Sequence, residues 1–153
     1  MTPAIDLLRR TGTEHTVLTY DSAGTDFGHE AAVELGLSMD EVFKTLVVDA
    51  DGGLAVAVVP VGSTLSLKAM AAALGAKRVS LADVARAERA TGYVAGGISP
   101  LGQRRKLPTV VDSSATRLST VHVSGGRRGV EIALVPDDLV SLVDAALAPI
   151  AAT

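Results

Sequence analysis

Residues 91–106 hold the densest group of residues suited to chemistry in this chain. The run Thr91-Gly92-Tyr93-Val94-Ala95-Gly96-Gly97-Ile98-Ser99-Pro100-Leu101-Gly102 is followed at once by Gln103-Arg104-Arg105-Lys106. Glycine reaches positive φ and permits close backbone approach, whereas proline fixes φ and lacks an N–H donor. The pattern therefore predicts a shaped loop whose backbone N–H groups can face a ligand. The three cations behind it favour a ligand with a polar, reactive end and a polyanionic body.

Lys44 is the second candidate, because it lies in the apolar segment Phe43-Lys44-Thr45-Leu46-Val47-Val48. An ammonium group among buried neighbours is costly unless it reaches solvent or an anion. Two interpretations stay open at this point. Either Lys44 begins a strand and extends to the surface, or it lies at the mouth of a pocket and holds a phosphate or a ribose.

Glu131 is the matching acidic residue. It alternates with Val130 and Ile132, which places it on the opposite face of the expected strand. That face is either solvent or the wall of a site. The histidines His15, His29 and His122 lack metal-ligand spacing, and the chain has no cysteine, which excludes a thiolate nucleophile and a disulfide framework. The familiar hydrolase and P-loop motifs are also missing.

Charge is distributed unevenly along the chain. The net charge is −3, yet residues 1–76 contain four Lys/Arg and ten Asp/Glu, while residues 77–134 contain ten Lys/Arg and four Asp/Glu. A local basic face can therefore dock phosphates on an acidic protein. The alternative is an ordinary surface of scattered, solvated charges. From these residues alone, the sequence indicates a polyanion-binding domain with a small polar pocket.

The elements expected around these residues mix hairpins with scattered helices. Asp51-Gly52-Gly53 is a turn signal between two apolar strands, and Thr2-Pro3, Ser66 and Pro136 are helix-start signals. Helices are expected over about 3–11, 26–35, 66–74, 80–90 and 136–147. Strands are expected over about 15–20, 43–50, 54–61, 77–79, 108–112, 119–124 and 129–135. This order favours an α/β protein of the α+β type, with a mixed sheet surrounded by helices.

The length of 153 residues favours one domain over 1–153. The N-terminus lacks the basic and apolar regions of a signal peptide, and the longest apolar runs fall far short of the ~20 residues of a membrane span. A cytoplasmic protein with no membrane partner is therefore expected.

Several separated motifs resemble the YbaK family of Cys-tRNA(Pro) deacylases, within the superfamily of prolyl-tRNA synthetase editing domains. They occur in the family's order and run almost end to end. They are Met1-Thr2-Pro3-Ala4, Thr19-Tyr20, Thr25-Asp26-Phe27-Gly28, Val42-Phe43-Lys44-Thr45-Leu46, Leu74-Gly75-Ala76-Lys77, Thr91-Gly92-Tyr93, Gly96-Gly97-Ile98-Ser99-Pro100-Leu101-Gly102-Gln103, Leu107-Pro108-Thr109 and Val123-Ser124-Gly125-Gly126-Arg127-Arg128-Gly129.

The resemblance implies a mixed, largely antiparallel and partly barrel-like sheet, and hydrolysis of the ester of mischarged tRNA(Pro). It implies that the substrate's own thiol attacks the ester carbonyl, with no cofactor and no metal. Lys44 is then tied to the terminal adenosine, and the glycine loop lies against the aminoacyl group. The implied catalytic residues are Lys44, Gly96 and Gly97, and the implied substrate-binding residues are Tyr20, Phe27, Ile98, Ser99, Pro100 and Glu131. Where this chain has Glu131, the family pattern carries Asp.

The implied partners are tRNA(Pro) charged with Cys or Ala and, in a ternary complex, prolyl-tRNA synthetase. The candidate contacts to tRNA phosphates are Arg104, Arg105, Lys106, Arg127 and Arg128. Two alternatives remain. One is an Ala-tRNA(Pro) deacylase, and the other is a non-catalytic tRNA-binding or regulatory module.

Overall fold

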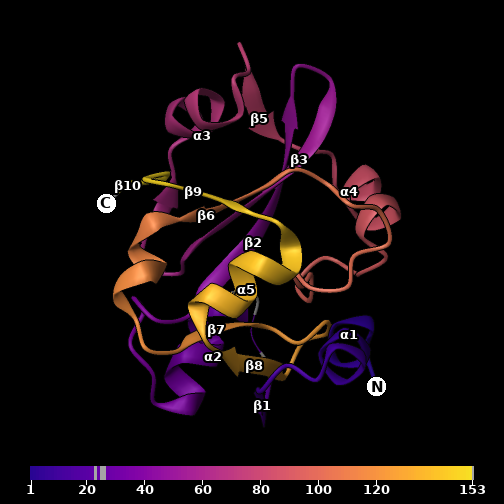
Figure 1. Cartoon of the computed structure of the whole chain (residues 1–153), viewed down its shortest axis with the longest axis vertical. Helices are drawn as coiled ribbons and strands as arrows, with labels where there is room; N and C mark the ends of the chain where they lie inside the picture. The colour runs from indigo at the N-terminus through magenta and orange to yellow at the C-terminus, as the bar shows by residue number, and fades with distance from the viewer. Residues whose placement is uncertain (23, 25–26, 153) are drawn as a thin grey trace.

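The computed structural model describes residues 1–22, 24 and 27–152, with only the backbone of Phe27 (Figure 1). The helices are α1 (Pro3–Thr11), α2 (Phe27–Leu35), α3 (Leu67–Leu74), α4 (Val84–Thr91), the 3-10 helix η1 (Ser113–Arg117) and α5 (Pro136–Val143). The strands are β1 (Thr16–Thr19), β2 (Phe43–Ala50), β3 (Gly53–Pro60), β4 (Thr64–Leu65), β5 (Val79–Leu81), β6 (Thr109–Asp112), β7 (Val121–Ser124), β8 (Val130–Leu134), β9 (Ala146–Ala148) and β10 (Ala151–Ala152).

The strands form three sheets. A five-stranded mixed sheet has the order β5-β2-β3-β6-β9, in which β3, β6 and β9 are parallel to one another and β2 is antiparallel to both its neighbours. An antiparallel three-stranded sheet has the order β1-β8-β7, and β10 pairs with β4. The α+β architecture with a mixed sheet is therefore confirmed.

An isolated parallel bridge between Val42 and His122 joins the five-stranded and three-stranded sheets. On either side of this bridge, the His122 N–H donates to the Glu41 carbonyl and the Val61 N–H donates to the Val42 carbonyl. The two sheets consequently meet just before β2 begins. That junction places the start of β2 beside β7 and, one strand further, β8.

Strand β3 is buried on both faces, which explains its continuous apolar sequence. Val56 and Val58 contribute to the core that also contains residues of α1, α5 and the three-stranded sheet. Ala55, Ala57 and Val59 face a second core together with Met70 of α3. Because two cores share β3, the sheet that carries β2 is held firmly from both sides.

Local capping signals are confirmed at two helices. The Thr2 hydroxyl accepts a hydrogen bond from the Ile5 N–H, and the Ser66 hydroxyl accepts one from the Ala69 N–H. Both helices end at a glycine of positive φ, Gly12 and Gly75.

Two expectations about elements are wrong. The expected helix over 136–147 ends at Val143, because Asp144 adopts the left-handed conformation with φ 53°, and Leu147 then lies on β9. The strand expected over 77–79 is β5, Val79–Leu81, and its neighbouring helix begins after the N-cap Asp83. Just before β2, the Ser38 N–H donates to the Glu41 carboxylate at 3.0 Å and closes a turn. In the part of the chain that is described, no helix has the length and apolar character of a membrane span.

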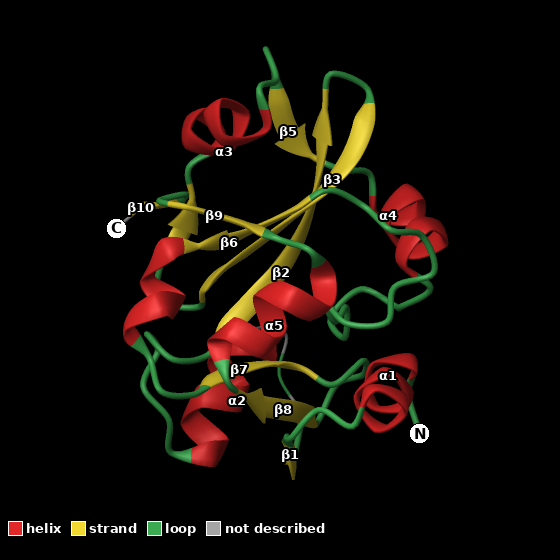
Figure 2. Cartoon of the chain, viewed as in Figure 1, coloured by secondary structure: helices red, strands yellow, loops and turns green. Residues whose placement is uncertain are grey.

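The glycine-rich segment is a loop, as predicted, and runs without regular structure from the end of α4 to β6 (Figure 2). It crosses between α4 and α1 and approaches the backbone of both the first helix and the β7–β8 turn. A Cβ on Gly102 would lie 2.6 Å from the Pro3 carbonyl oxygen, and one on Gly97 would lie 2.6 Å from the Arg127 Cα. These contacts fix the loop against the three-stranded sheet.

Candidate functional site

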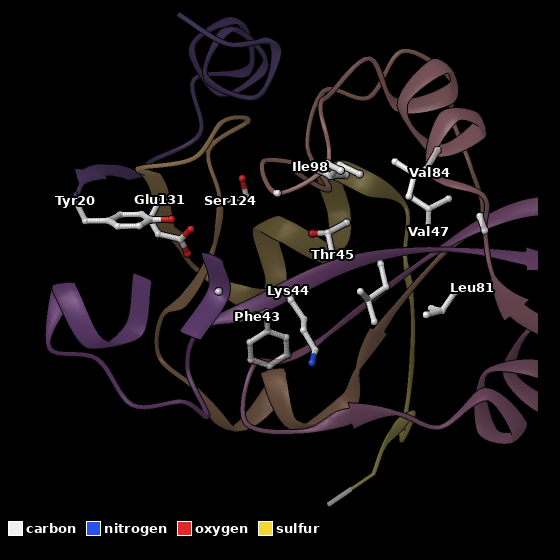
Figure 3. A pocket seen from close by; sticks show the side chains of 16 residues that line it. Tyr20, Phe43, Lys44, Thr45, Val47, Leu81, Val84, Ile98, Ser124 and Glu131 are labelled. Atoms are coloured by element: carbon white, nitrogen blue, oxygen red, sulfur yellow. The ribbon is translucent and has the colours of Figure 1, made fainter. Parts of the chain in front are cut away.

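An open pocket of about 440 Å³ lies where β2, the glycine loop and the three-stranded sheet converge. Figure 3 shows Tyr20 and Glu131 at one end, Leu81 and Val84 at the other, and Lys44, Thr45, Ser124 and Ile98 between them. The lining residues are Tyr20, Gly28, Phe43, Lys44, Thr45, Leu46, Val47, Leu81, Ala82, Val84, Ala87, Ala95, Gly96, Ile98, Ser124 and Glu131.

Lys44 lies on β2 and is the one cationic side chain in that lining. Its side chain is half-buried, and across residues 1–22, 24 and 27–152 its ammonium has neither a hydrogen bond nor an ion pair with the protein. Gly28 of α2 lies close beside it, since a Cβ there would be 2.6 Å from Val61 Cγ1 and 3.8 Å from Lys44 Cβ. Lys44 therefore borders the pocket, and its charge has no partner among the described residues.

Glu131 is buried, with 4% of its surface exposed, although its strand alternation was equally consistent with a solvent face. On β8 it pairs with Ser124 of β7 on one side and Leu18 of β1 on the other. Its Oε2 atom is buried and has no hydrogen-bond partner in the described structure. Burial raises the pKa of Glu131 to about 8, because a carboxylate loses its hydration there.

Tyr20 follows β1 directly and lies beside Glu131 in Figure 3. Its N–H donates to the Gly129 carbonyl at 3.0 Å, which ties it to the β7–β8 turn. Burial is the largest cause that raises the pKa of Tyr20, and the charge of Glu131 acts in the same direction. Phe27 is also expected to bind substrate, but its side chain lies outside the described part of the structure. Thr25 and Asp26 of the same motif lie outside it entirely.

The glycine loop divides its residues between the pocket and the protein interior. Gly96 and Ile98 line the pocket, whereas Gly97, Ser99 and Pro100 are buried and lie outside the lining. The Ser99 hydroxyl accepts a hydrogen bond from the Leu101 N–H at 3.2 Å, so it shapes the loop.

Backbone N–H groups are available in this loop, but at particular positions. The Gly97 N–H already donates to the Val94 carbonyl at 2.9 Å. The N–H groups of Gly96 and Ile98 have no acceptor in the described structure. The two loop residues that line the pocket, one on each side of Gly97, therefore each keep an N–H without an acceptor among the described residues.

Tyr93, the other tyrosine of the chain, stabilises the loop from its buried side. Only 3% of it is exposed, and its hydroxyl donates to the Leu101 carbonyl at 2.6 Å. Burial raises the pKa of Tyr93 to about 12. Glu88 fastens the outer part of the loop by accepting a hydrogen bond from the Ala95 N–H at 2.8 Å.

The five cations expected to contact tRNA fall into two groups. Arg127 and Arg128 are exposed on the β7–β8 turn, and Arg128 donates to the Ser22 carbonyl at 3.4 Å, near the Tyr20 end of the pocket. The other group lines a separate hollow of about 420 Å³ together with Pro100, and consists of Arg104, Arg105 and Lys106. Lys106 is paired there with Asp144 at 3.2 Å.

Sequence reasoning missed several pocket residues. The Thr45 hydroxyl is buried without a hydrogen-bond partner and lines the pocket next to Lys44. Ser124 lines it as well, and its hydroxyl accepts from the Gly126 N–H at 3.1 Å. Adjacent residues of a strand point to opposite faces, so Lys44 as a candidate does not predict that Thr45 also lines the pocket. Ser124 could have been predicted only from the register of β7 against β8, which pairs it with Glu131. Among the described residues, no three His, Cys, Asp or Glu side chains gather as metal ligands.

The fold is shared with solved structures. A crystallised protein provisionally described as a trans-editing enzyme for prolyl-tRNA synthetase superposes with a TM-score of 0.88 at 23% identity, over 99% of this chain and 96% of its own. The crystallised hypothetical protein APE2540 gives the same TM-score at 28% identity, over 98% and 99%.

The chain belongs to the aminoacyl-tRNA editing domain family, which matches residues 25–142. A relative from Enterococcus faecalis, provisionally named Cys-tRNA(Pro)/Cys-tRNA(Cys) deacylase EbsC, is 39% identical over 120 residues, which cover 78% of this chain and 73% of the relative. The family resemblance read from the motifs is therefore confirmed.

Proposed function

We propose that the chain is a single editing domain that hydrolyses mischarged Cys-tRNA(Pro) in trans, in the cytoplasm. The observation that carries the proposal is one pocket of an editing-family protein whose lining combines the cation Lys44, the loop residues Gly96 and Ile98, and the buried carboxyl of Glu131. The name of the relative EbsC supports the same substrate class.

Each of these groups has a task in ester hydrolysis. Lys44 holds the phosphate or ribose of the terminal adenosine, which fixes the ester relative to the loop. We assign to the N–H groups of Gly96 and Ile98, two loop residues that line the pocket, the task of stabilising the oxyanion that develops on the ester carbonyl. Because an aminoacyl ester is already activated, the protein need not supply a strong nucleophile.

For a cysteinyl ester the nucleophile is the substrate's own thiol. Its sulfur forms a bond to the carbonyl carbon, the bond to the ribose oxygen breaks, and that oxygen leaves with the thiol proton. Water then opens the resulting thiolactone to free cysteine. Editing is needed because a site for a small apolar side chain rejects similar amino acids by only about 1–3 kcal/mol.

The exposed arginines Arg104, Arg105, Arg127 and Arg128 are the proposed contacts to tRNA phosphates, together with Lys106. Selection of tRNA(Pro) is assigned to prolyl-tRNA synthetase in a ternary complex. Co-migration of the chain, the synthetase and tRNA(Pro) in gel filtration tests this part of the proposal.

Deacylation of Cys-tRNA(Pro) and Ala-tRNA(Pro), measured side by side, tests the activity. We expect faster loss of the cysteinyl ester and a fall in kcat/KM of about 100-fold or more in Lys44→Ala, since a charged contact to the substrate is lost. Lys68→Ala is the matched control, because Lys68 is an exposed lysine of α3 outside the pocket.

The other outcomes separate the alternatives. Faster loss of the alanyl ester keeps the reaction class but excludes a mechanism that requires a substrate thiol. Stable esters at high protein concentration, with tRNA still bound, would leave a non-catalytic tRNA-binding module.

A further inference from the structure

We propose that Glu131 receives the α-ammonium group of the aminoacyl moiety, so that the pocket accepts esters with a free amine and rejects N-acylated esters such as peptidyl-tRNA. The inference rests on the proposed function and adds the chemical class of substrate that the site accepts. It concerns the end of the pocket formed by the three-stranded sheet.

Charge complementarity is the first argument. Among the described residues, the lining contains one cation, Lys44, and one carboxyl, Glu131, and each comes from a different sheet. The reacting end of an aminoacyl-tRNA likewise carries one anion, the phosphate, and one cation, the α-ammonium. With Lys44 matched to the phosphate or ribose, Glu131 is the remaining ionisable group of the described lining and the ammonium is the remaining charged partner. An ammonium beside the carboxyl favours its ionised form.

The unsatisfied state of Glu131 is the second argument. Its Oε2 is buried and has no partner within residues 1–22, 24 and 27–152, and only 4% of the residue is exposed. A buried carboxyl without a partner is costly, whereas an apolar residue at the same place would pack at no such cost. A cation supplied by the substrate removes that cost, and burial then strengthens the interaction.

The register of β8 gives the third argument. Val130 and Ile132 point into the core, so Glu131 necessarily points to the pocket side of the strand. The residue opposite it, Ser124, already uses its hydroxyl oxygen as acceptor for the Gly126 N–H. Leu18 and Ser124, the residues paired with Glu131 on the two neighbouring strands, carry no positive charge.

N-acylation removes the positive charge of the α-amine, which is the feature that Glu131 would recognise. An amide nitrogen carries no charge and keeps a single N–H, and its acyl group adds bulk next to Tyr20. A hydrogen bond to a charged group contributes enough for about a 10- to 100-fold effect on binding. The site should thus spare peptidyl-tRNA and formylated aminoacyl-tRNA.

The experiment compares two esters that share the thiol and the tRNA but differ in the amine: Cys-tRNA(Pro) and N-acetyl-Cys-tRNA(Pro). For the wild type we expect kcat/KM to be at least about 10-fold lower for the acetylated ester. In Glu131→Gln we expect a 10- to 100-fold loss on the free-amine ester and little change on the acetylated one, so that the preference collapses. Glu131→Asp keeps the carboxyl and should keep the preference.

The preference ratio separates recognition from general damage, since a distorted pocket would lower both rates together. Equal wild-type rates on the two esters, or equal losses in Glu131→Gln, would overturn the inference while leaving the proposed function intact. If the wild type cleaves neither ester, the proposed function fails. Calorimetric binding of amide-linked cysteinyl-adenosine and its N-acetyl form then decides the inference, which requires a preference for the free amine that Glu131→Gln removes.

Discussion

The two ends of the pocket differ in sheet, burial and polarity. The polar end comes from the three-stranded sheet and contains Tyr20, Ser124 and the buried Glu131. The apolar end comes from β5 and α4, where Leu81 and Val84 are 63% and 58% exposed. Strand register fixes the polar end, which suits it to recognise a small charged group. The apolar end is an open surface that suits a flat, weakly polar part of a ligand.

Replacement of Glu131, the carboxyl of the polar end, should have the largest effect of the changes considered. The affected quantity is the pH dependence of the free energy of unfolding. The pKa of Glu131 is raised to about 8 from an ordinary value of 4.5, so the folded protein keeps a proton that the unfolded chain loses between these pH values. The free energy of unfolding should therefore be highest below pH 4.5 and should fall as the pH rises to about 8.

Glu131→Gln removes this dependence, and relative to the wild type it should gain on the order of 5 kcal/mol between pH 4.5 and pH 8.5, at about 1.4 kcal/mol per pKa unit. Urea unfolding of both proteins at several pH values measures the gain. Parallel curves for the two proteins would show that Glu131 titrates normally.

Gly97→Ala should distort the glycine loop, which contributes Gly96 and Ile98 to the pocket. Its Cβ would lie 2.6 Å from the Arg127 Cα and 3.0 Å from the Arg127 carbonyl carbon, and backbone atoms cannot rotate away. We expect a loss of about 1–3 kcal/mol in stability, measured by urea unfolding, and slower deacylation because the N–H groups of Gly96 and Ile98 shift. Gly53→Ala is the control, since its nearest non-neighbouring atom is 3.7 Å away. An equal effect at the two positions would contradict the steric explanation.

Leu81→Ala tests the apolar end. Because Leu81 is largely exposed, truncation should barely change stability, while the lost contact should raise KM a few-fold, corresponding to roughly 1 kcal/mol. Steady-state kinetics on Cys-tRNA(Pro) provides the measurement, and kcat should stay unchanged. A fall in kcat with constant KM would place this end in the chemical step instead.

Arg105→Ala should give the smallest effect. If this exposed arginine contacts one phosphate, its removal weakens binding several-fold and reduces the slope of log K against log salt by just under one. Filter binding of tRNA(Pro) at several salt concentrations, with Arg89→Ala of α4 as the control, measures the slope. An unchanged slope would show that Arg105 makes no phosphate contact and would contradict tRNA binding at the hollow lined by Arg104, Arg105 and Lys106.

Local signals predicted much of the fold, because capping residues and turns act within a few positions. Thr2, Ser66 and the Asp51-Gly52 turn specify their elements regardless of the rest of the chain. The alanine-rich C-terminus shows where such signals fail. It favours helix, yet β9 pairs in parallel with β6, and Asp112 accepts hydrogen bonds from the Ile150 and Ala151 N–H groups. Tertiary hydrogen bonds there override local propensity.

The candidate site was predictable where a charge interrupts an apolar strand, as Lys44 and Glu131 do. Thr45 and Ser124 gave no such signal, since hydroxyl residues are ordinary in strands. Their place in the pocket depends on bringing β2 beside β7, elements about 80 residues apart in sequence. The pocket roles of Ser99, Pro100 and Phe27 remain predictions.

The bridge between Val42 and His122 means that a ligand in the pocket can hold the two sheets together. Lys44 and Glu131 belong to two sheets that meet at this bridge, so a ligand held by both residues acts as a cross-link between them. The binding free energy then adds to the work of separating the sheets. Hydrogen–deuterium exchange at the His122 amide, which donates to the Glu41 carbonyl, should slow on ligand binding and thereby report occupancy of the pocket from outside it.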